Sequence, residues 1–405
     1  METKLVRIAE ISATTKHPIF TSVYHLINED MLKQCHKELD GSKAVGIDKV
    51  TKDEYGKNLD RNIKDLVQRL KNKSFKPLPS LRVYIPKGNG KKRPLGIASY
   101  EDKIVQMAVK KILGAIYEPR FLNCMYGFRP NRGCHEAIKE VYQRISYGKI
   151  SYIVDADIKG FFDHIDHEWM MKFLEWNIQD KNLLWLIRKY LKAGIMEQGK
   201  FEPTEEGSAQ GSVMSPMLAN IYMHHVLTLW FKLVVQREMQ GECFLVNFAD
   251  DFVAGFQYKS EAERYYKELK ERMEKFGLEL ESSKSRLIEF GRFAEQNRRA
   301  RGECKPETFD FLGFTFYCGR SRKGMPYIMP KTSSKKFRQK IRDIKVWLYA
   351  NRDQPLKKLM GTLNLKLIGH YRYYGISFNG RMISNYKQQV RELLFKVLNR
   401  RSDRK

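Results

Sequence analysis

The chain has 405 residues, 42% of them hydrophobic, which is enough for two or three domains with cores of their own. Lys and Arg number 74 against 47 Asp and Glu, so the formal net charge is +27 and a polyanionic partner is indicated. No apolar run approaches about 18 residues and the N-terminus lacks the apolar core of a signal peptide, so we expect a cytoplasmic protein that binds nucleic acid rather than membrane. The six cysteines show no C-x-x-C spacing, which indicates free thiols rather than a zinc ribbon.

The first third of the chain is predicted to be helical around one basic hairpin. Helical periodicity marks residues 21–40, 52–72 and 101–117. Residues 81–87 and 91–97 read as two strands around a Gly-Asn-Gly turn. The hairpin bears five basic side chains: Arg82, Lys87, Lys91, Lys92 and Arg93. They are either a solvated surface or a positively charged flap over a phosphate chain. The loop YGFRPNR at 126–132 mixes aromatic rings with arginines, which suits base stacking.

Two segments place carboxylates at the ends of predicted strands. CFLVNFADDFVAGFQ at 243–257 sets Asp250 and Asp251 between two apolar runs, which predicts a hairpin with both carboxylates at its tip. Two adjacent carboxylates repel, and a divalent cation would relieve that repulsion, although a lone Asp-Asp pair also fits a solvated turn. YIVDAD at 152–157 predicts a strand on which Asp155 and Asp157 share one face. If this strand lies beside the hairpin, either carboxylate could face its tip.

The remaining segments predict further helices, a flexible loop and a basic C-terminal domain. Helices are expected at 166–176, 182–192 and 260–276. The small-residue loop at 207–214 leads to a helix capped by Ser215 and running to 235, an arrangement that favours an anionic ligand. Strands are expected at 278–288 and 309–317, joined by a loosely specified connector. Residues 331–405 hold 20 Lys and Arg against 4 Asp and Glu with helical periodicity, so we predict domains at 1–325 and 326–405.

Together these residues favour two-metal chemistry on a nucleic acid. Asp157, Asp250 and Asp251 would be costly to gather without cations, and carboxylate oxygens are the ligands that Mg²⁺ prefers. Two such ions about 4 Å apart activate a 3′-hydroxyl and stabilise a leaving pyrophosphate. The pattern therefore predicts nucleotidyl transfer.

The order of these motifs resembles that of the group II intron-encoded reverse transcriptases, also called maturases. The resemblance rests on KAVGID (43–48), IPKGNGKKRPLGI (85–97), YGFRPNR (126–132), DIKGFFD (157–163), QGSVMSP (210–216) with Asn220, FADD (248–251) and FLGF (311–314). It implies an α+β right-hand polymerase, with fingers and palm on an antiparallel sheet and an α-helical thumb or maturase domain. It also implies intron RNA, an RNA template, a DNA primer and dNTPs as partners, and leaves the oligomeric state open.

The resemblance assigns roles to individual residues. Asp157, Asp250 and Asp251 would hold two Mg²⁺ ions, with Mn²⁺ as a possible substitute. Phe162 would lie under the sugar of the incoming nucleotide and reject a 2′-hydroxyl. The remaining nucleotide contacts would be Lys87 and Arg93 at the triphosphate, Gln210 in the pocket and Lys284 near the pyrophosphate. Asp155 and Asp163 are expected to be structural.

The sequence departs from the family pattern in three places. Ser208-Ala-Gln-Gly-Ser212 replaces Thr-Pro-Gln-Gly-Gly, and Phe248 replaces a commoner tyrosine; we expect both to be tolerated. The chain stops at Lys405, so we expect it to lack the His-Asn-His endonuclease region and most of the DNA-binding region of many relatives.

Three other functions compete with this interpretation. The protein could be a splicing factor with secondary polymerase activity, or a stand-alone reverse transcriptase in phage defence. A metal-dependent glycosyltransferase would use Asp155-Ala-Asp157 as its Asp-x-Asp motif, but that leaves the Asp250-Asp251 hairpin and the charge of +27 unexplained.

Overall fold

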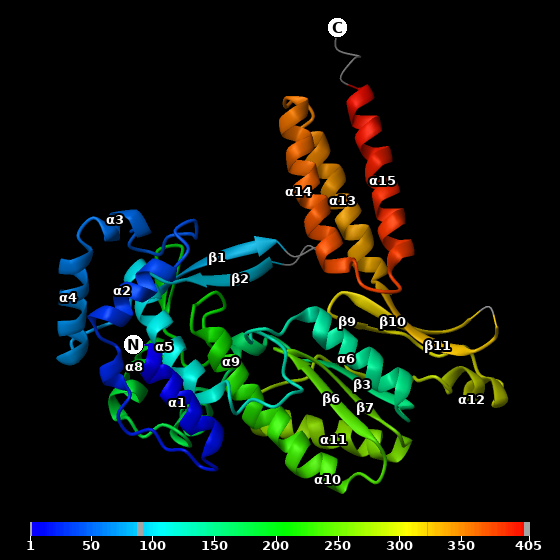
Figure 1. Ribbon diagram of the computed structural model, residues 1–405, viewed down its shortest axis with the longest axis horizontal. Helices are drawn as coiled ribbons and strands as arrows, with labels where there is room; N and C mark the ends of the chain where they lie inside the picture. The colour runs from blue at the N-terminus through cyan, green and yellow to red at the C-terminus, as the bar shows by residue number, and fades with distance from the viewer. Residues whose placement is uncertain (1, 87–91, 322, 401–405) are drawn as a thin grey trace.

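The computed structural model describes residues 2–86, 92–321 and 323–400. A helical N-terminal body, a central antiparallel sheet and a three-helix bundle make up the molecule, and the chain passes from the central sheet back to the N-terminal body between β3 and β6 (Figure 1). The molecule combines many helices with largely antiparallel sheets, which agrees with the predicted α+β class. Lys87 and Lys91 of the predicted basic hairpin lie outside the described residues.

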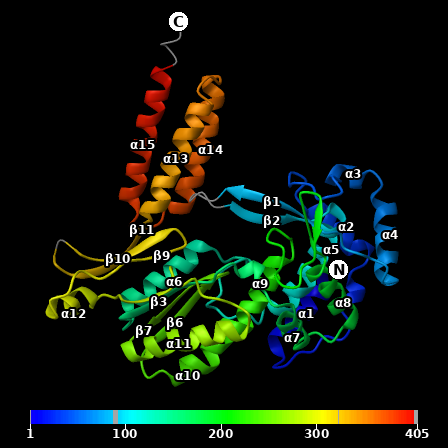
Figure 2. The ribbon, with the colours of Figure 1, turned by 180° about the vertical axis from the view of Figure 1, so that it is seen from behind.

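The N-terminal body encloses one small sheet within helices. Its strands β1 (Ser80–Pro86), β2 (Lys92–Ile97), β4 (Ile195–Glu197) and β5 (Lys200–Glu202) lie in the order β2-β1-β4-β5. Its helices are α1 (Glu2–Thr14), α2 (Glu29–Glu38), α3 (Lys52–Gly56), α4 (Leu59–Lys71), α5 (Tyr100–Tyr117), α7 (His167–Glu175) and α8 (Lys181–Leu191). Helix α1 was not predicted. The hairpin of β1 and β2 points from this body toward the three-helix bundle, as Figure 1 and the reverse view in Figure 2 both show.

A buried carboxylate joins the sheet of this body to its helices. Asp102 accepts hydrogen bonds from Ser99 Oγ at 2.6 Å, from the backbone N–H of Leu78 at 3.1 Å and from the hydroxyl of Tyr190 at 3.2 Å. Burial raises the pKa of Asp102 to about 6, and the three hydrogen bonds only partly oppose this rise. Asp102 therefore ties α5 to α8 and to the residues that precede β1.

The central sheet has the strand order β6-β7-β3-β8 and is antiparallel throughout. Its strands are β3 (Tyr152–Asp157), β6 (Cys243–Phe248), β7 (Asp251–Phe256) and β8 (Arg286–Glu289). Helix α6 (Cys134–Tyr147) covers one face and α11 (Lys259–Lys275) the other (Figure 1). The strand predicted at 278–288 is wrong in extent, because turns occupy residues 282–284 and pairing with β3 begins only at Arg286.

One long apolar helix runs through the core beneath the sheet. It begins as α9 (Ser215–Met223), passes through two π-helical segments and ends at α10 (Gln236–Glu238). Ser215–Glu238 is long and apolar enough to cross a membrane by length and composition, so the expectation that no such run exists was wrong. However, 72% of its most apolar window is buried inside the protein, which is how the core helix of a folded domain passes the same test.

A second antiparallel sheet, of order β11-β10-β9, connects the central sheet to the bundle. Its strands are β9 (Phe309–Phe311), β10 (Phe314–Arg320) and β11 (Pro326–Thr332). The single strand predicted at 309–317 is therefore wrong: Leu312 and Gly313, with φ of 48° and 79°, fold it back on itself. Strand β11 was not predicted, and the connector before β9 contains α12 (Ala294–Ala300).

The C-terminal residues form three long helices with a core of their own. The bundle consists of α13 (Ser334–Ala350), α14 (Leu356–Tyr374) and α15 (Gly380–Asn399). Its apolar cluster includes Phe337, Leu348, Leu363, Tyr386 and Val390. The bundle projects from the rest of the molecule, with the C-terminus at its far end (Figure 1). The helical prediction is confirmed, whereas the domain boundaries at 325 and 326 stay a prediction.

Candidate active site

The predicted hairpin exists and carries Asp250 at its turn. Strands β6 and β7 are joined by Ala249 and Asp250, and Phe248 pairs with Asp251 across the ladder. Ala249 has a φ of 58°, the left-handed backbone that two-residue hairpin turns require and that costs a non-glycine residue about 1 kcal/mol. Asn247 is fully buried and its side-chain amide donates to the Ala249 carbonyl at 2.8 Å. This hydrogen bond holds the turn in its left-handed form.

A neighbouring loop supports the same turn from outside. The Tyr126 N–H donates to the Asn247 carbonyl and the Asn247 N–H to the Cys124 carbonyl, both at 2.8 Å. A Cβ atom on Gly127 would stand 2.5 Å from the backbone nitrogen of Ala249, so only glycine fits there. Asn220 of α9 donates to the Gly127 carbonyl at 2.8 Å. Sequence reasoning assigned this loop to base stacking and missed its structural role; the one available signal was Asn220, which accompanies the QGSVMSP motif four residues after its end.

Strand β3 lies beside β7, and of the two carboxylates that the shared-face argument left open it brings Asp157 next to the turn. Asp157 pairs directly with Asp251 in the antiparallel ladder. The ammonium group of Lys284 forms an ion pair with the Asp157 carboxylate. Asp155, two residues earlier, lies 3.9 Å from Arg286 on β8, measured from Oδ2 to Nε, in keeping with a structural role.

Crowding and partial burial raise the proton affinity of these carboxylates. The pKa of Asp251 rises to about 7, mainly because the surrounding protein removes hydration from its carboxylate. Repulsion from Asp250, and then from Asp157, adds to this rise, although part of the Asp251 side chain is open to the cleft. Burial raises the pKa of Asp250 as well, with a smaller contribution from Asp157. Hydrogen bonding to Asp157 raises the pKa of Lys284. Concentrated negative charge of this kind favours the binding of cations.

The donor set fits hard divalent cations, but the arrangement is not a finished metal site. Three carboxylates from two strands and a turn meet in one cleft, and oxygen ligands are what Mg²⁺ and Mn²⁺ take. Among the described residues, however, no group of three or more His, Cys, Asp or Glu is placed so that it could hold one metal ion. The cation beside Asp157 is Lys284, so metal binding there would require this lysine to move away.

One cleft of about 1340 Å³ collects most of the predicted site residues. Its walls include the three aspartates together with Arg93, Phe162, Gln210 and Lys284. Arg93 lies close enough to Asp250 to lower the proton affinity of its carboxyl group. Four lysines of the bundle also line the cleft, here called the cleft lysines: Lys335, Lys336, Lys340 and Lys366. Of the predicted site residues only Lys87 cannot be placed, because it lies outside the described ranges.

Backbone hydrogen bonds connect the predicted nucleotide contacts. The Gly96 N–H of β2 donates to the Gln210 carbonyl at 2.7 Å, and the Ser208 N–H donates to the Phe162 carbonyl at 2.7 Å. Gly211 takes a φ of 112°, and its Cβ position lies 3.0 Å from the Gly96 carbonyl. Strand β2, the 207–214 loop and Phe162 therefore form one connected wall.

The start of α9 differs from the prediction. Ser215 lies inside the helix, Met214 is its N-cap residue, and Pro216 follows as the second helical residue. The Ser215 hydroxyl donates to the Ala209 carbonyl at 2.9 Å and lies 2.6 Å from Ser208 Oγ. Ser215 thus holds the loop closed over the helix end instead of capping the helix. Gly277, by contrast, follows α11 with a φ of 72° and closes that helix, in agreement with the predicted end at residue 276.

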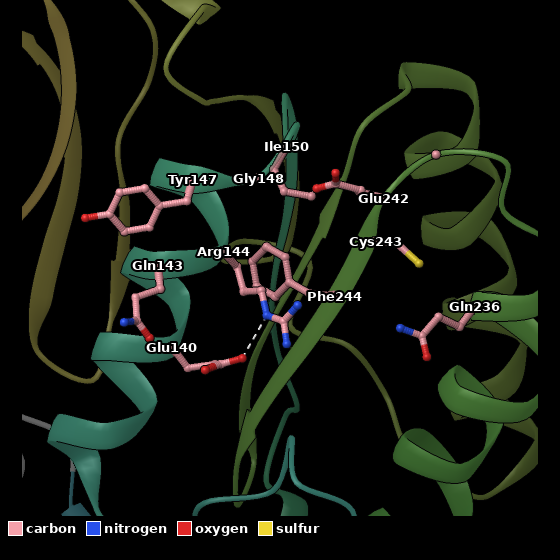
Figure 3. A pocket seen from close by; sticks show the side chains of 11 residues that line it. Glu140, Gln143, Arg144, Tyr147, Gly148, Ile150, Gln236, Glu242, Cys243 and Phe244 are labelled. Carbon is pink, nitrogen blue, oxygen red and sulfur yellow. Dashed lines mark hydrogen bonds and ion pairs between the residues drawn. The ribbon is translucent and has the colours of Figure 1, made fainter.

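A second cavity, of about 590 Å³, lies where α6 ends and β6 begins (Figure 3). Arg144 Nε donates to Glu140 at 2.8 Å, and the Glu242 carboxylate accepts from the Lys149 N–H at 2.9 Å. None of the predicted site residues lines it. Its charges have partners nearby, so the cleft with the aspartates is the better candidate for chemistry.

Comparison with known proteins identifies the family to which this chain belongs. The family described as reverse transcriptase (RNA-dependent DNA polymerase) matches residues 85–316, more than half of the chain. The group II intron-encoded protein LtrA of Lactococcus lactis subsp. cremoris is 37% identical over 238 residues. This chain belongs to the group II intron-encoded reverse transcriptases. Reverse transcriptases in general use divalent metal ions and act on nucleic acid.

The match to these reverse transcriptases is partial in length. The aligned region covers 58% of this chain but 39% of LtrA. A protein in the cob intron of Schizosaccharomyces pombe is 36% identical over 50% of this chain and 25% of its own length. A putative COX1/OXI3 intron 1 protein of Saccharomyces cerevisiae is 39% identical over 37% of this chain and 18% of its own length. This reverse transcriptase therefore spans well under two thirds of the relatives it matches.

Proposed function

We propose that this protein is an RNA-directed DNA polymerase of the group II intron type that also binds intron RNA to assist splicing and mobility. The observation that carries the proposal is the register of β3 and β7, which sets Asp157 against Asp251 beside the Asp250 turn in a cleft open to large substrates. Asp157, Asp250 and Asp251 would hold two Mg²⁺ ions, or Mn²⁺ in their place. When bound, these ions would make the primer 3′-hydroxyl a better nucleophile and neutralise charge on the leaving pyrophosphate.

The other residues of the cleft would bind and orient the nucleotide. Arg93 is exposed on β2 near Asp250 and would pair with the triphosphate of an incoming dNTP, together with Lys87. Gln210 would line the base and sugar pocket, where its backbone is fixed to Gly96. Phe162 would stack under the sugar, where its ring would leave no room for a 2′-hydroxyl. Lys284 would move from Asp157 to the pyrophosphate and donate a proton to it.

The arrangement of the three bodies supports a right-hand polymerase. In this proposal residues 1–325 form the fingers and palm, and residues 326–405 form the thumb or maturase domain. The cleft lysines on α13 and α14 would contact the backbone of the primer–template duplex. The large excess of Lys and Arg over Asp and Glu after residue 330 is what binding to a structured intron RNA requires, so a splicing role remains compatible with polymerase activity.

Primer extension tests the proposal directly. The full chain is incubated with an RNA template, a DNA primer, dNTPs and Mg²⁺, beside the double variant Asp250→Ala, Asp251→Ala. We expect extension by the wild type and none by the variant, with equal binding of primer–template. If folded wild-type protein bound the duplex but did not extend it, the proposal would fail in favour of a splicing factor without polymerase chemistry.

A further inference from the structure

The outer face of the β10–β11 hairpin carries two tyrosines and a lysine that the proposed function does not use. The ladder register places Thr315, Tyr317 and Gly319 of β10 on the same side as Tyr327, Met329 and Lys331 of β11, and we call these six residues the tyrosine face. The opposite side packs inward, where Phe314, Phe316 and Ile328 are buried in the core. Folding therefore needs the inner side, whereas the tyrosines of the outer side stay partly exposed.

The two tyrosines are held as an open platform. A Cβ atom at Gly319 would stand 2.7 Å from the ring of Tyr327, so this ring lies across the backbone of the neighbouring strand. The ring centroids of Tyr317 and Tyr327 are 6.2 Å apart at an interplanar angle of 81°. One face of Tyr327 is therefore covered by Gly319, and the side chain as a whole stays partly exposed. A residue larger than glycine at 319 would push the ring out of this position.

Two cationic side chains lie beside the platform. The Lys331 ammonium lies 4.8 Å from the centroid of the Tyr317 ring. Arg381 at the start of α15 is exposed and lies close enough to Tyr317 to act on its phenol electrostatically. Both strands are described over their full length, and neither carries an Asp or Glu. The face is therefore complementary to an anionic ligand that also offers flat rings.

The tyrosine face is continuous with the cleft at one end. Thr315 pairs with Asp310 of β9, and its hydroxyl donates to the Asp310 carboxylate. Asp310 and Ser333 both line the cleft and are joined by a hydrogen bond of 3.0 Å. A strand that leaves the cleft past Asp310 would reach Lys331 first and the two tyrosines next.

We infer that the tyrosine face binds unpaired RNA nucleotides outside the cleft, with a base stacked on Tyr327 and phosphates at Lys331 and Arg381. Every base has a flat face, so such a site tolerates any sequence, and backbone charge supplies the rest of the affinity. The inference rests on the proposed nucleic-acid binding but not on polymerase chemistry, so a test by binding alone separates the two.

The test compares primer–template duplexes with and without a single-stranded RNA overhang. The overhang is placed at the end of the duplex that leaves the cleft. Fluorescence anisotropy gives the dissociation constants of the full chain for both at one fixed salt concentration. We expect the overhang to tighten wild-type binding about tenfold, which is the effect of one base stacked on an aromatic ring at ~1.4 kcal/mol. The double variant Tyr317→Thr, Tyr327→Thr keeps β-branched strand formers and should lose this gain while binding the blunt duplex as before.

Two control variants and one control ligand sharpen the result. Tyr317→Phe, Tyr327→Phe keeps both rings and should keep the gain. Tyr147→Ala removes a tyrosine that is 73% exposed beside the second cavity (Figure 3) and should also keep it. An abasic overhang of equal length keeps the phosphates but loses the stacking, so most of the tenfold gain should disappear. A gain that survives in the threonine variant, or that an abasic overhang reproduces, would overturn the inference.

The position of the added nucleotides distinguishes their source. If the gain is seen only when the overhang is joined to the duplex, the bound nucleotides belong to the strand that leaves the cleft. If a free single-stranded RNA competes for the tyrosine face with the duplex already bound, the face also accepts a separate RNA. Both results support the inference, whereas loss of polymerase activity alone has no bearing on it.

Discussion

The buried amide of Asn247 gives the sharpest test of how the turn that carries Asp250 is built. Asn247→Ala removes the 2.8 Å hydrogen bond to the Ala249 carbonyl and leaves a buried acceptor unpaired, at a cost of about 1–3 kcal/mol. The Asn247 side-chain oxygen has no hydrogen-bond partner within the described residues, so its removal offsets part of that cost. We therefore expect the free energy of unfolding to fall by about 1–2 kcal/mol, a value that chemical denaturation measures.

The same substitution should reduce catalysis far more than it reduces stability. Asp250 follows Ala249 directly, and a catalytic group displaced by about 1 Å loses about 100-fold in rate. Single-turnover primer extension at saturating primer–template should therefore slow about 100-fold without a change in duplex affinity. Adding Ala249→Gly should recover stability, because glycine takes the φ of 58° without strain.

Asn177→Ala is the matched control, because Asn177 is also buried and donates its amide to a backbone carbonyl, that of Pro18, at 3.0 Å. It should lose similar stability but keep the rate of extension. If Asn247→Ala slowed extension no more than Asn177→Ala at a temperature where both are folded, the role assigned to the Asn247 hydrogen bond would be refuted.

Three further outcomes are expected from other parts of the molecule. Phe162→Ala should raise the ratio of ribonucleotide to deoxyribonucleotide incorporation, and an unchanged ratio would contradict its placement under the sugar. Replacing the four cleft lysines by glutamine should lower the slope of log Kd against log salt by about 3, since each phosphate contact contributes about 0.7–0.9, whereas glutamine at exposed lysines of α11 should leave it unchanged. The pKa of Asp102 is about 6 in the folded protein and about 3.9 in the unfolded chain, so the folded protein binds this proton more tightly. The resulting contribution to stability is fully present below about pH 4 and is lost as the pH rises through about 6. The stability of the wild type relative to Asp102→Asn should fall by about 2–3 kcal/mol from pH 4 to 7, and a constant difference would contradict the burial argument.

The parts of the site that sequence could predict are those set by strand periodicity and motif order. Alternation along β3 and β7 is enough to bring Asp157 and Asp251 to one face, and two apolar runs around two residues are enough to predict the turn. The resemblance supplied Phe162, Gln210, Arg93 and Lys284, which the structure gathers in the same cleft. Local patterns were sufficient because each of these residues sits at a fixed offset from a strand or a turn.

Features that depend on distant partners could not be read from local patterns. Asn247 looked like one more residue of an apolar strand, yet its amide is aimed at a carbonyl that only the left-handed turn exposes. Phe309 to Tyr317 read as one strand because the segment is strongly apolar, but its alternation changes phase at Leu312-Gly313, where the chain reverses. Ser215 matched an N-cap pattern, but its hydroxyl is used by Ala209 across the loop. In each case a tertiary hydrogen bond or turn overrode the local signal.

The helix Ser215–Glu238 explains why these distant contacts hold together. At its start Ser215 fixes the loop that carries Gln210, and one turn further Asn220 fixes Gly127, which supports Ala249 beside Asp250. The predicted nucleotide pocket and the carboxylate turn are thus attached to one helix less than two turns apart. A helix that holds both parts of the cleft in place must not shift when substrate binds. Its burial on nearly every side keeps it fixed. The composition that allows this helix to pass for a membrane span is therefore the composition that positions the candidate active site.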